Sequence, residues 1–180
     1  MASLNLLPPP NFTNRFGRMV WLAVYWVFFR FSPTIFHPWR CFLLRLFGAK
    51  VGRGAHPYPS CQIWAPWNLI MEEKACLAPG VICYNVALVH LGANTIISQR
   101  SNLCTASHDF DRIDFPLTGA PIILEENVWV TSEVFIGPGV KMEYGSVALA
   151  RAVVTRNVER LSVVGGNPAN PIRERQYHTS

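Results

Sequence analysis

The sequence predicts a mainly β protein in which short strands coil into a parallel β-helix, preceded by a helical arm. The main observation is a six-residue period between residues 51 and 154, interrupted by insertions. Of the fifteen residues that lead a repeat, fourteen are apolar, where a composition of 50% hydrophobic residues would give about half. The leading residues are Val51, Pro57, Ile63, Met71, Leu77, Cys83, Leu91, Ile97, Leu103, Leu124, Val130, Ile136, Met142, Ala148 and Val154.

A period of six fits neither an amphipathic helix, which repeats every 3.6 residues, nor a single strand, which alternates every two. It fits a short strand followed by a tight corner, and three such units form a triangular coil of 18 residues. Inward side chains are buried only when coils stack, so the repeat predicts a solenoid. Two extra residues precede both Met71 and Leu91, which places them at the same corner of successive coils. We expect about five coils, roughly 4.8 Å apart.

Glycine and asparagine recur where the corners are expected. Gly follows the leading residue at Gly52, Gly92 and Gly137, and Asn94 and Asn127 lie at equivalent corner positions. Both residue types adopt backbone angles that other residues avoid. We therefore assign residues 51–165 to the solenoid and residues 166–180 to a C-terminal tail.

Residues 1–50 differ from the solenoid in composition. Residues 1–71 contain seven Lys or Arg and no Asp or Glu, and 15 of the 22 aromatic residues lie there, whereas the remainder has nine basic and eleven acidic residues. Apolar segments at 19–29 and 39–47, separated by Pro33 and Pro38, predict two short helices. An apolar run of 11 residues is too short to span a bilayer, which takes about 20.

Two interpretations of the arm remain open. It packs on the solenoid or between subunits, or it lies in a membrane interface through residues 15–47, with arginines facing anionic lipid. Its basic residues are too scattered to follow a nucleic-acid backbone. Five cysteines without a C-x-x-C pair favour reduced thiols, and the N-terminus does not resemble a secretory signal. We expect a cytoplasmic protein, with the inner face of the membrane as the place where such an arm would bind.

The repeat breaks once, between Leu103 and Leu124, with an excursion over residues 106–121. Such long loops are usually functional. His108 lies where the chain leaves the coil, at a position that faces outward. An imidazole there suits a general base, because its pKa lies near neutrality, and the alternative is a surface histidine.

The sequence resembles the hexapeptide-repeat acyltransferases, and most closely the colanic-acid-type polysaccharide acetyltransferases, which are related to galactoside, maltose and nodulation acetyltransferases. The resemblance rests on ordered segments along nearly the whole chain: IWAPWNL (63–69), CYNV (83–86), CTASHDF (104–110), FPLTGAPI (115–122), VWV (128–130) and VVGGNPANPI (163–172). It implies a left-handed β-helix, a homotrimer and an acetyl-CoA-dependent O-acetyltransferase for a saccharide hydroxyl, in surface polysaccharide biosynthesis. Alternatives are an antibiotic, serine or amino-sugar acceptor, or a non-catalytic trimeric scaffold or membrane-attached module.

The resemblance also implies roles for individual residues. The backbone N–H of Ser132, from a neighbouring subunit, would bind the oxyanion, and Asn85 would bind the acceptor unless it is a corner residue. Asp109 is a candidate for orienting His108 at the acceptor. From the register alone, His90 lies 18 residues before His108, so the two would stack in adjacent strands and His90 would line the acceptor pocket.

Coenzyme A would lie along the late coils. The resemblance implies contacts of Ala150 and Thr155 with the pantetheine arm, while Arg156, Arg173 and Arg175 are candidates for its phosphates. Asn167-Pro168 matches a turn whose peptide bond is a candidate cis bond. Trp64 and Trp67 would stack a sugar or cover the corner where the arm packs. Zinc would need three histidine ligands. His90 and His108 could supply two of them, but His37, His56 and His178 lie in the arm, the first coil and the tail. No third ligand is evident, so we expect no metal.

Overall fold

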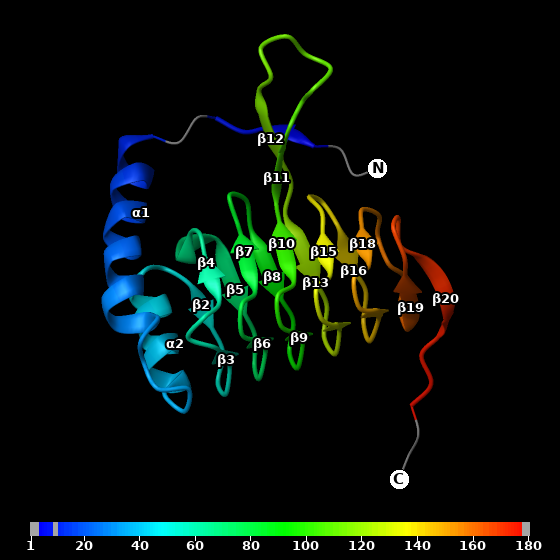
Figure 1. Ribbon diagram of the computed structural model, residues 1–180, viewed down its shortest axis with the longest axis horizontal. Coiled ribbons are helices and arrows are strands. Elements are labelled where there is room, and N and C mark those ends of the chain that lie inside the picture. The colour runs from blue at the N-terminus through cyan, green and yellow to red at the C-terminus, as the bar shows by residue number, and fades with distance from the viewer. Residues whose placement is uncertain (1–3, 9–10, 178–180) are drawn as a thin grey trace.

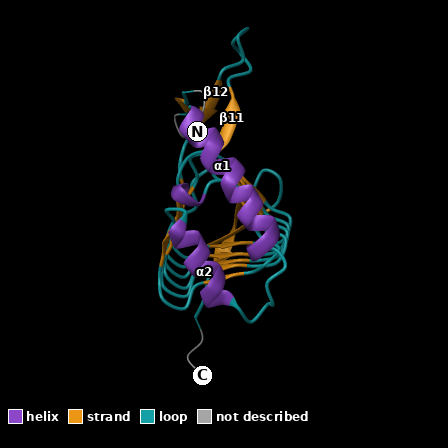
Figure 2. Ribbon diagram, turned by 90° about the vertical axis from the view of Figure 1, so that its left-hand side faces the viewer, coloured by secondary structure: helices purple, strands orange, loops and turns teal. Residues whose placement is uncertain are grey.

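The computed structural model describes residues 4–8 and 11–177 and shows a stack of coils (Figure 1) that forms a three-sided prism (Figure 2). Each coil passes through three parallel sheets in turn. Sheet I contains β2 (Lys50–Val51), β5 (Leu69–Met71), β8 (Val89–Leu91), β13 (Ile122–Leu124) and β16 (Lys141–Met142). Sheet II contains β3 (His56–Pro57), β6 (Cys76–Leu77), β9 (Ile96–Ile97), β14 (Trp129–Val130), β17 (Val147–Ala148), β19 (Ser162–Gly165) and β20 (Asn170–Glu174). Sheet III contains β4 (Gln62–Ile63), β7 (Ile82–Tyr84), β10 (Asn102–Cys104), β15 (Phe135–Ile136) and β18 (Val153–Val154).

The period of six predicted this core correctly. All the leading residues except the half-buried Val51 are buried, including the irregular Pro57 and Cys83. Through the described part of the chain, sheet II has six parallel strands, so the solenoid has about six turns rather than five. The additional layer is β19, to which β20 adds an antiparallel strand, so part of the predicted tail belongs to the sheet. The Asn167–Pro168 bond in the intervening turn is cis, as predicted.

The corners explain two of the repeated glycines. A Cβ atom on Gly52 would lie 2.6 Å from the backbone of Glu72, and one on Gly92 would lie 2.6 Å from the backbone of Glu125. At these positions the next coil passes too close for any side chain. Asn94 and Asn127 have positive φ, as expected for corner residues, and so does Lys74.

The arm packs across the first coil and closes that end of the prism (Figure 2). It consists of α1 (Phe12–Val24), a π-helical turn η1 (Tyr25–Phe29) and α2 (His37–Leu46). Trp21 is buried and its Nε1 donates a hydrogen bond to the carbonyl of Ile63 at 2.7 Å. The interpretation that the arm packs on the solenoid is therefore confirmed for its inner face.

Arg40 secures the arm from within. It is completely buried, and its Nε donates to the carbonyl of Pro57 at 2.7 Å. Its remaining N–H groups donate to Ser32, Pro33 and Thr34 in the turn before α2. Burial lowers the pKa of this guanidinium, although carbonyl and hydroxyl oxygens solvate it. The expectation that the arm's arginines face lipid is wrong for Arg40.

The outer face of the arm remains apolar and exposed. Phe31 is 74% exposed and Ile35 is 79% exposed, and Trp26, which would be buried in a purely packed arm, is 51% exposed. In the described residues, no helix is long and apolar enough to cross a membrane.

Candidate active site

The excursion of the chain forms a β-hairpin that projects from one long edge of the prism (Figure 1). Its strands are β11 (Ala106–His108) and β12 (Leu117–Gly119), and it joins β10 of sheet III to β13 of sheet I. The two-residue insertions also lie between sheets III and I, one of them folded as the 3₁₀ turn η2 (Pro66–Asn68). All three irregularities of the repeat therefore share one edge, which we call edge III–I.

His108 ends β11, with its ring exposed and its orientation fixed. Its Nδ1 lies 2.8 Å from the carbonyl oxygen of Phe115, and the Phe115 ring stacks on the imidazole at 4.8 Å and 11°. A carbonyl only accepts hydrogen bonds, so Nδ1 carries the proton of the neutral ring. Nε2 then presents its lone pair outward, which is the state that a general base requires.

Phe115, rather than Asp109, orients His108. Phe115 has a φ of 46°, an uncommon value for a residue with a side chain. The Asp109 carboxylate instead accepts from the backbone N–H of Asp111 at 3.3 Å, within the hairpin loop. The expectation that Asp109 orients the imidazole is therefore wrong. No sequence signal marked this turn, because a residue that precedes proline usually adopts an extended conformation.

The N-terminus holds the hairpin in place, which sequence analysis missed. The strand β1 (Asn5–Leu6) pairs antiparallel with β12, and the N–H of Leu7 donates to the carbonyl of Leu117 at 2.9 Å. Leu117 is directly opposite His108 in the hairpin register. A two-residue strand carries no periodic signal, so only the fold reveals it.

His90 does not stack with His108, so that prediction is wrong. His90 lies in β8 and pairs with Ile70 and Ile123 in the neighbouring coils. The spacing of 18 residues does not bring His90 and His108 into register, because the hairpin makes this coil longer than 18 residues. His90 Nε2 instead lies 2.7 Å from the carboxylate of Glu72.

Asn85 has the contacts of a corner residue. It is completely buried on edge III–I, and its Oδ1 accepts from the N–H of Ala65 at 3.0 Å. Its Nδ2 donates to the carbonyls of Ala65 and Asn68. The corner interpretation accounts for these contacts, while contact of Asn85 with an acceptor stays a prediction.

Ser132 lies on a different edge, where β14 of sheet II turns into β15 of sheet III; we call this edge II–III. Within the described residues its N–H has no hydrogen-bond partner, whereas its carbonyl accepts from the N–H of Arg151. The neighbouring Glu133 is bonded to Arg151 at 2.7 Å and paired with Arg100. These arginines lower the pKa of Glu133, so its carboxylate stays ionised near the Ser132 turn.

One chain thus places His108 and Ser132 on different long edges, separated by the width of sheet III. A site that uses both needs a second copy of the chain. The candidate coenzyme residues divide in the same way. Ala150 follows β17 on edge II–III, while Thr155 and Arg156 follow β18 on edge III–I, and all three are exposed.

The two late arginines are less available than expected. Arg175 donates through one nitrogen to the carbonyls of Asn127 and Gly145, both at 3.0 Å, and stacks on Tyr177. Arg173 is exposed and donates to the carbonyl of Glu174. Arg175 therefore stabilises a corner, and Arg173 retains the freer guanidinium.

The two tryptophans have different surroundings. Trp67 packs close to Gly17 and Gly48 of the arm, 3.4 Å and 3.2 Å from where their Cβ atoms would lie, so it covers the corner. Trp64 is half exposed, lies under the guanidinium of Arg18 at 4.7 Å and contacts the ring of Tyr84.

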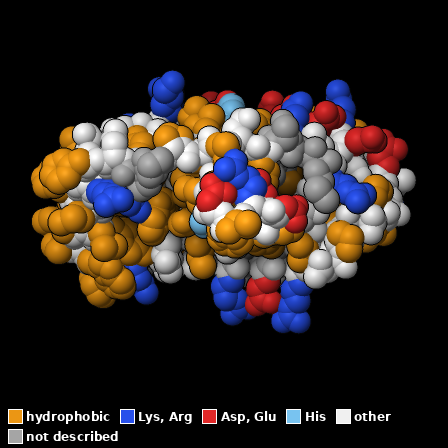
Figure 3. Space-filling view, turned by 90° about the horizontal axis from the view of Figure 1, so that it is seen from above, with side chains coloured by type: hydrophobic (Ala, Val, Ile, Leu, Met, Phe, Trp, Pro, Cys, Tyr) orange, Lys and Arg blue, Asp and Glu red, His pale blue; other side chains and the backbone are white. Residues whose placement is uncertain are grey.

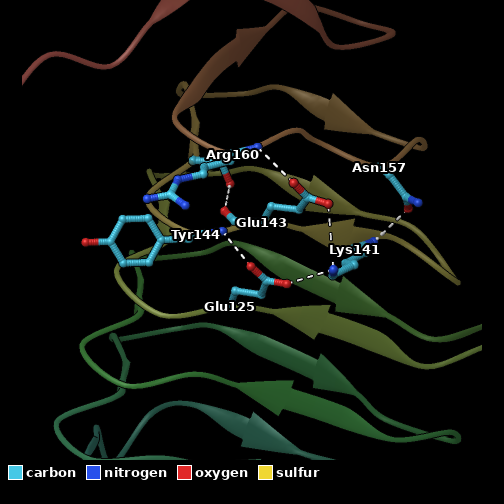
Figure 4. Close-up of polar contacts among 7 residues, drawn as sticks. Glu125, Lys141, Glu143, Tyr144, Asn157 and Arg160 are labelled. Carbon is cyan, nitrogen blue, oxygen red and sulfur yellow. Dashed lines mark hydrogen bonds and ion pairs between the residues drawn. The ribbon is translucent and has the colours of Figure 1, made fainter.

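Acidic and basic side chains form a charge cluster on the remaining edge, between sheets I and II (Figure 4). Glu125 binds Lys141 at 2.7 Å and accepts from the backbone N–H of Tyr144. The ammonium group lowers the pKa of Glu125, and the carboxylate raises the pKa of Lys141. This cluster ties successive coils together.

The described residues contain no group of three His, Cys, Asp or Glu side chains that could hold a metal. His37 and His56 contact each other at 5.0 Å, where the arm meets sheet II, and His178 lies outside the described residues. Burial raises the pKa of the Cys61 thiol to about 12, which keeps it protonated.

No family model matches the chain. The chain is 40% identical over 162 residues to the colanic acid biosynthesis acetyltransferase WcaF of Escherichia coli K12, covering 90% of this chain and 89% of that protein. The chain belongs to this acetyltransferase family. The resemblance inferred from sequence and the predicted acyltransferase class are thereby confirmed.

Solved structures confirm the fold. A maltose O-acetyltransferase from Clostridium difficile superposes with a TM-score of 0.84 at 22% identity, covering 93% of this chain and 90% of that one. A galactoside acetyltransferase in complex with coenzyme A gives a TM-score of 0.82 at 21% identity, covering 96% and 87%. The match to these left-handed β-helices agrees with the predicted fold class.

Proposed function

We propose that this protein is an acetyl-CoA-dependent O-acetyltransferase that modifies a saccharide hydroxyl, with His108 as the general base. The observation that carries the proposal is the bond from His108 Nδ1 to the Phe115 carbonyl, because it leaves Nε2 free to accept a proton. The relative that is 40% identical to this chain is named for colanic acid biosynthesis, which supports a surface polysaccharide as the acceptor. The galactoside acetyltransferase bound to coenzyme A supports acetyl-CoA as the donor.

In this mechanism Nε2 removes the proton of the acceptor hydroxyl as its oxygen attacks the thioester carbonyl. The tetrahedral intermediate carries an oxyanion, which needs donors that are already in place. The unpartnered N–H of Ser132 from a neighbouring copy would serve. Collapse of the intermediate breaks the carbon–sulfur bond, and the imidazolium returns its proton to the departing thiolate.

Assembly as a homotrimer would bring edge III–I of one copy against edge II–III of the next. This arrangement would also join Ala150 of one copy to Thr155 and Arg156 of its neighbour along one coenzyme groove, with Arg173 beside it. Arg175, Asn85, His90 and Asp109 stay predictions as ligand contacts. None of these four residues takes part in the proposed proton transfer.

Replacing His108 with Ala tests the proposal. Removing a general base lowers turnover about 10²- to 10⁴-fold. We expect acetyl-CoA binding to persist and coenzyme A release in the presence of saccharides to fall by that factor. His56→Ala, an exposed histidine on sheet II, is the matched control and should keep wild-type turnover. Undiminished turnover of His108→Ala would overturn the assignment.

The acceptor needs a separate experiment. A panel of saccharides, chloramphenicol, serine and amino sugars should show coenzyme A release with saccharides only. Release with a different acceptor would move the protein to another acceptor class, and release with none would favour a non-catalytic scaffold.

We also propose that the outer face of the arm contacts an anionic membrane at the cytoplasmic side. Seen from above, hydrophobic side chains gather at the end of the molecule that carries the arm, with basic side chains among them (Figure 3). No acidic residue precedes Glu72, so this end complements a negative surface. Aromatic side chains such as Phe31 suit the interfacial layer.

Vesicle sedimentation tests this contact. The protein should sediment with anionic vesicles and less so at high salt, because screening acts within about 8 Å at physiological ionic strength. Ile35→Asp should weaken sedimentation. Ile113→Asp, at the fully exposed tip of the hairpin loop, adds the same charge elsewhere and should not. Equal sedimentation of both variants would exclude the arm as the contact.

A further inference from the structure

A groove of about 820 Å³ separates α1 from the outer surface of β4 and β7. The mechanism proposed above makes no use of it. Its walls come from the basic arm on one side and from sheet III on the other. The lining residues from the arm include three arginines, Arg15, Arg18 and Arg30. Among the described residues that line the groove, none is acidic.

Arg18 lies at the centre of this positive charge. Its guanidinium carbon lies 4.7 Å from the centre of the Trp64 ring, which holds the side chain across the groove. Its Nε is buried and has no hydrogen-bond partner in the described part of the chain. A buried N–H that lacks an acceptor is costly, and a guanidinium binds phosphate oxygens particularly well. Arg15 is one helical turn away on the same face of α1, which adds to the local charge.

The rest of the groove is apolar. Met19, Leu22 and Trp26 line it from the arm, and Ile82 lines it from β7. All four side chains are exposed, and Trp26 contacts Phe31 of the apolar outer face, with ring centroids 6.3 Å apart. The groove therefore combines an anion-binding centre with a hydrocarbon-binding wall, and that wall opens toward the surface that we propose contacts a membrane.

A second cavity of about 380 Å³ extends the groove toward the candidate active site. The two cavities share Arg18, Trp64 and Tyr84. The smaller one reaches Leu117, which pairs with His108 in the hairpin. A ligand whose anionic group lay on Arg18 would thus extend in one direction toward the base and in the other toward the apolar arm.

We propose that the groove binds a phosphate or diphosphate ester of a long apolar alcohol. The phosphate oxygens bind Arg18, with Arg15 and Arg30 adding charge, and the chain lies along Leu22 and Trp26. If the proposed function holds, the acceptor saccharide is attached to this phosphate and occupies the smaller cavity. The substrate class is then a lipid-linked saccharide.

Binding of geranylgeranyl diphosphate to the full-length protein tests the groove, with quenching of tryptophan fluorescence as the readout. Arg18→Gln should weaken binding at least tenfold, and Arg53→Gln, an exposed arginine outside the groove, should leave binding unchanged. Geranylgeraniol and inorganic diphosphate, which each lack one half of the ligand, should bind far more weakly than the ester.

Dihexanoyl phosphatidic acid distinguishes the two sources of a phosphate ester. Weaker binding than geranylgeranyl diphosphate supports a polyprenyl-type carrier. Equal binding overturns the lipid-linked saccharide and leaves a phospholipid headgroup as the ligand. The groove assignment is wrong if the wild type binds neither compound, which is the result expected if a neighbouring copy fills the groove. It is also wrong if Arg18→Gln binds both compounds as well as the wild type does.

The assay contains no acetyl-CoA, so its failure leaves the proposed acetyl transfer untouched. Intact binding together with undiminished turnover of His108→Ala would overturn the proposed base alone.

Discussion

The coils and the hairpin use their residues in different ways. In a coil, each inward side chain is covered by equivalent side chains in the coils on either side, as Leu91 is by Met71 and Leu124. In the hairpin, His108 has no equivalent in another coil. Its ring is held by Phe115 across the hairpin, and the hairpin itself is held by β1 from the far end of the sequence.

The repeated coils form the framework, and the one interruption of the repeat supplies the proposed base, whereas the proposed oxyanion donor of Ser132 comes from a coil corner. Repetition specifies burial through many equal contacts, none of which is unique. A catalytic group needs one fixed orientation and access to solvent, which the coil interior cannot provide. Perturbing the two regions should therefore have separable effects on activity and stability.

After His108→Ala, the largest expected effect falls on activity and comes from the Ser132 turn. Ser132→Pro removes the N–H proposed for the oxyanion, and the loss of one such donor lowers turnover about 10²- to 10³-fold. The corner accommodates proline, because Pro79 occupies the equivalent position two coils earlier. Steady-state turnover measures the loss of activity, and the thermal midpoint measures whether the corner keeps its stability.

Gln99→Pro is the matched control, since Gln99 has the same corner position in the adjacent coil. It should keep both wild-type activity and stability. A comparable loss of turnover in the two variants would show that proline, rather than the missing donor, is responsible.

A second prediction concerns stability alone. Gly92→Ala would place a Cβ 2.6 Å from the backbone of Glu125, so it should lower the free energy of unfolding by about 1–3 kcal/mol. At Gly137 the nearest atoms would be 3.5 Å away, so Gly137→Ala should be nearly neutral. Denaturant unfolding of both variants measures the difference. Equal stabilities would contradict the close approach of coils at this corner.

The smallest expected effect comes from the strand that holds the hairpin. Leu7→Pro removes the N–H that donates to Leu117, a hydrogen bond contributing about 1 kcal/mol. We expect turnover to fall roughly fivefold while the thermal midpoint of the coils changes little. A large drop in the midpoint with unchanged turnover would show that β1 supports the coils instead of the hairpin.

Much of the solenoid could be predicted from the sequence because its signal is repeated many times. Irregular leading residues such as Pro57 and Cys83 did not obscure it, and both are buried as the period requires. The period also placed the break that contains His108. It could not extend through that break, so the register carried from His90 to His108 was wrong.

The partners of the site residues could not be predicted, because they depend on contacts between distant segments. Phe115 orients His108 through its backbone carbonyl, which any residue possesses, and its positive φ leaves no clear mark in the sequence. The arm behaved similarly. Its helices were predicted from two apolar segments separated by prolines, but the buried Arg40 was indistinguishable in sequence from Arg30 and Arg45, which are not buried.

The proposed active site combines His108 of one copy with Ser132 of another, and complementation tests this arrangement most directly. His108→Ala and Ser132→Pro are each expected to be nearly inactive alone. Co-expressed in equal amounts, about three-quarters of random trimers are mixed, and each mixed trimer has one intact site of three. We therefore expect about a quarter of wild-type turnover in the mixture. Turnover no greater than the average of the two separate variants would contradict the shared site.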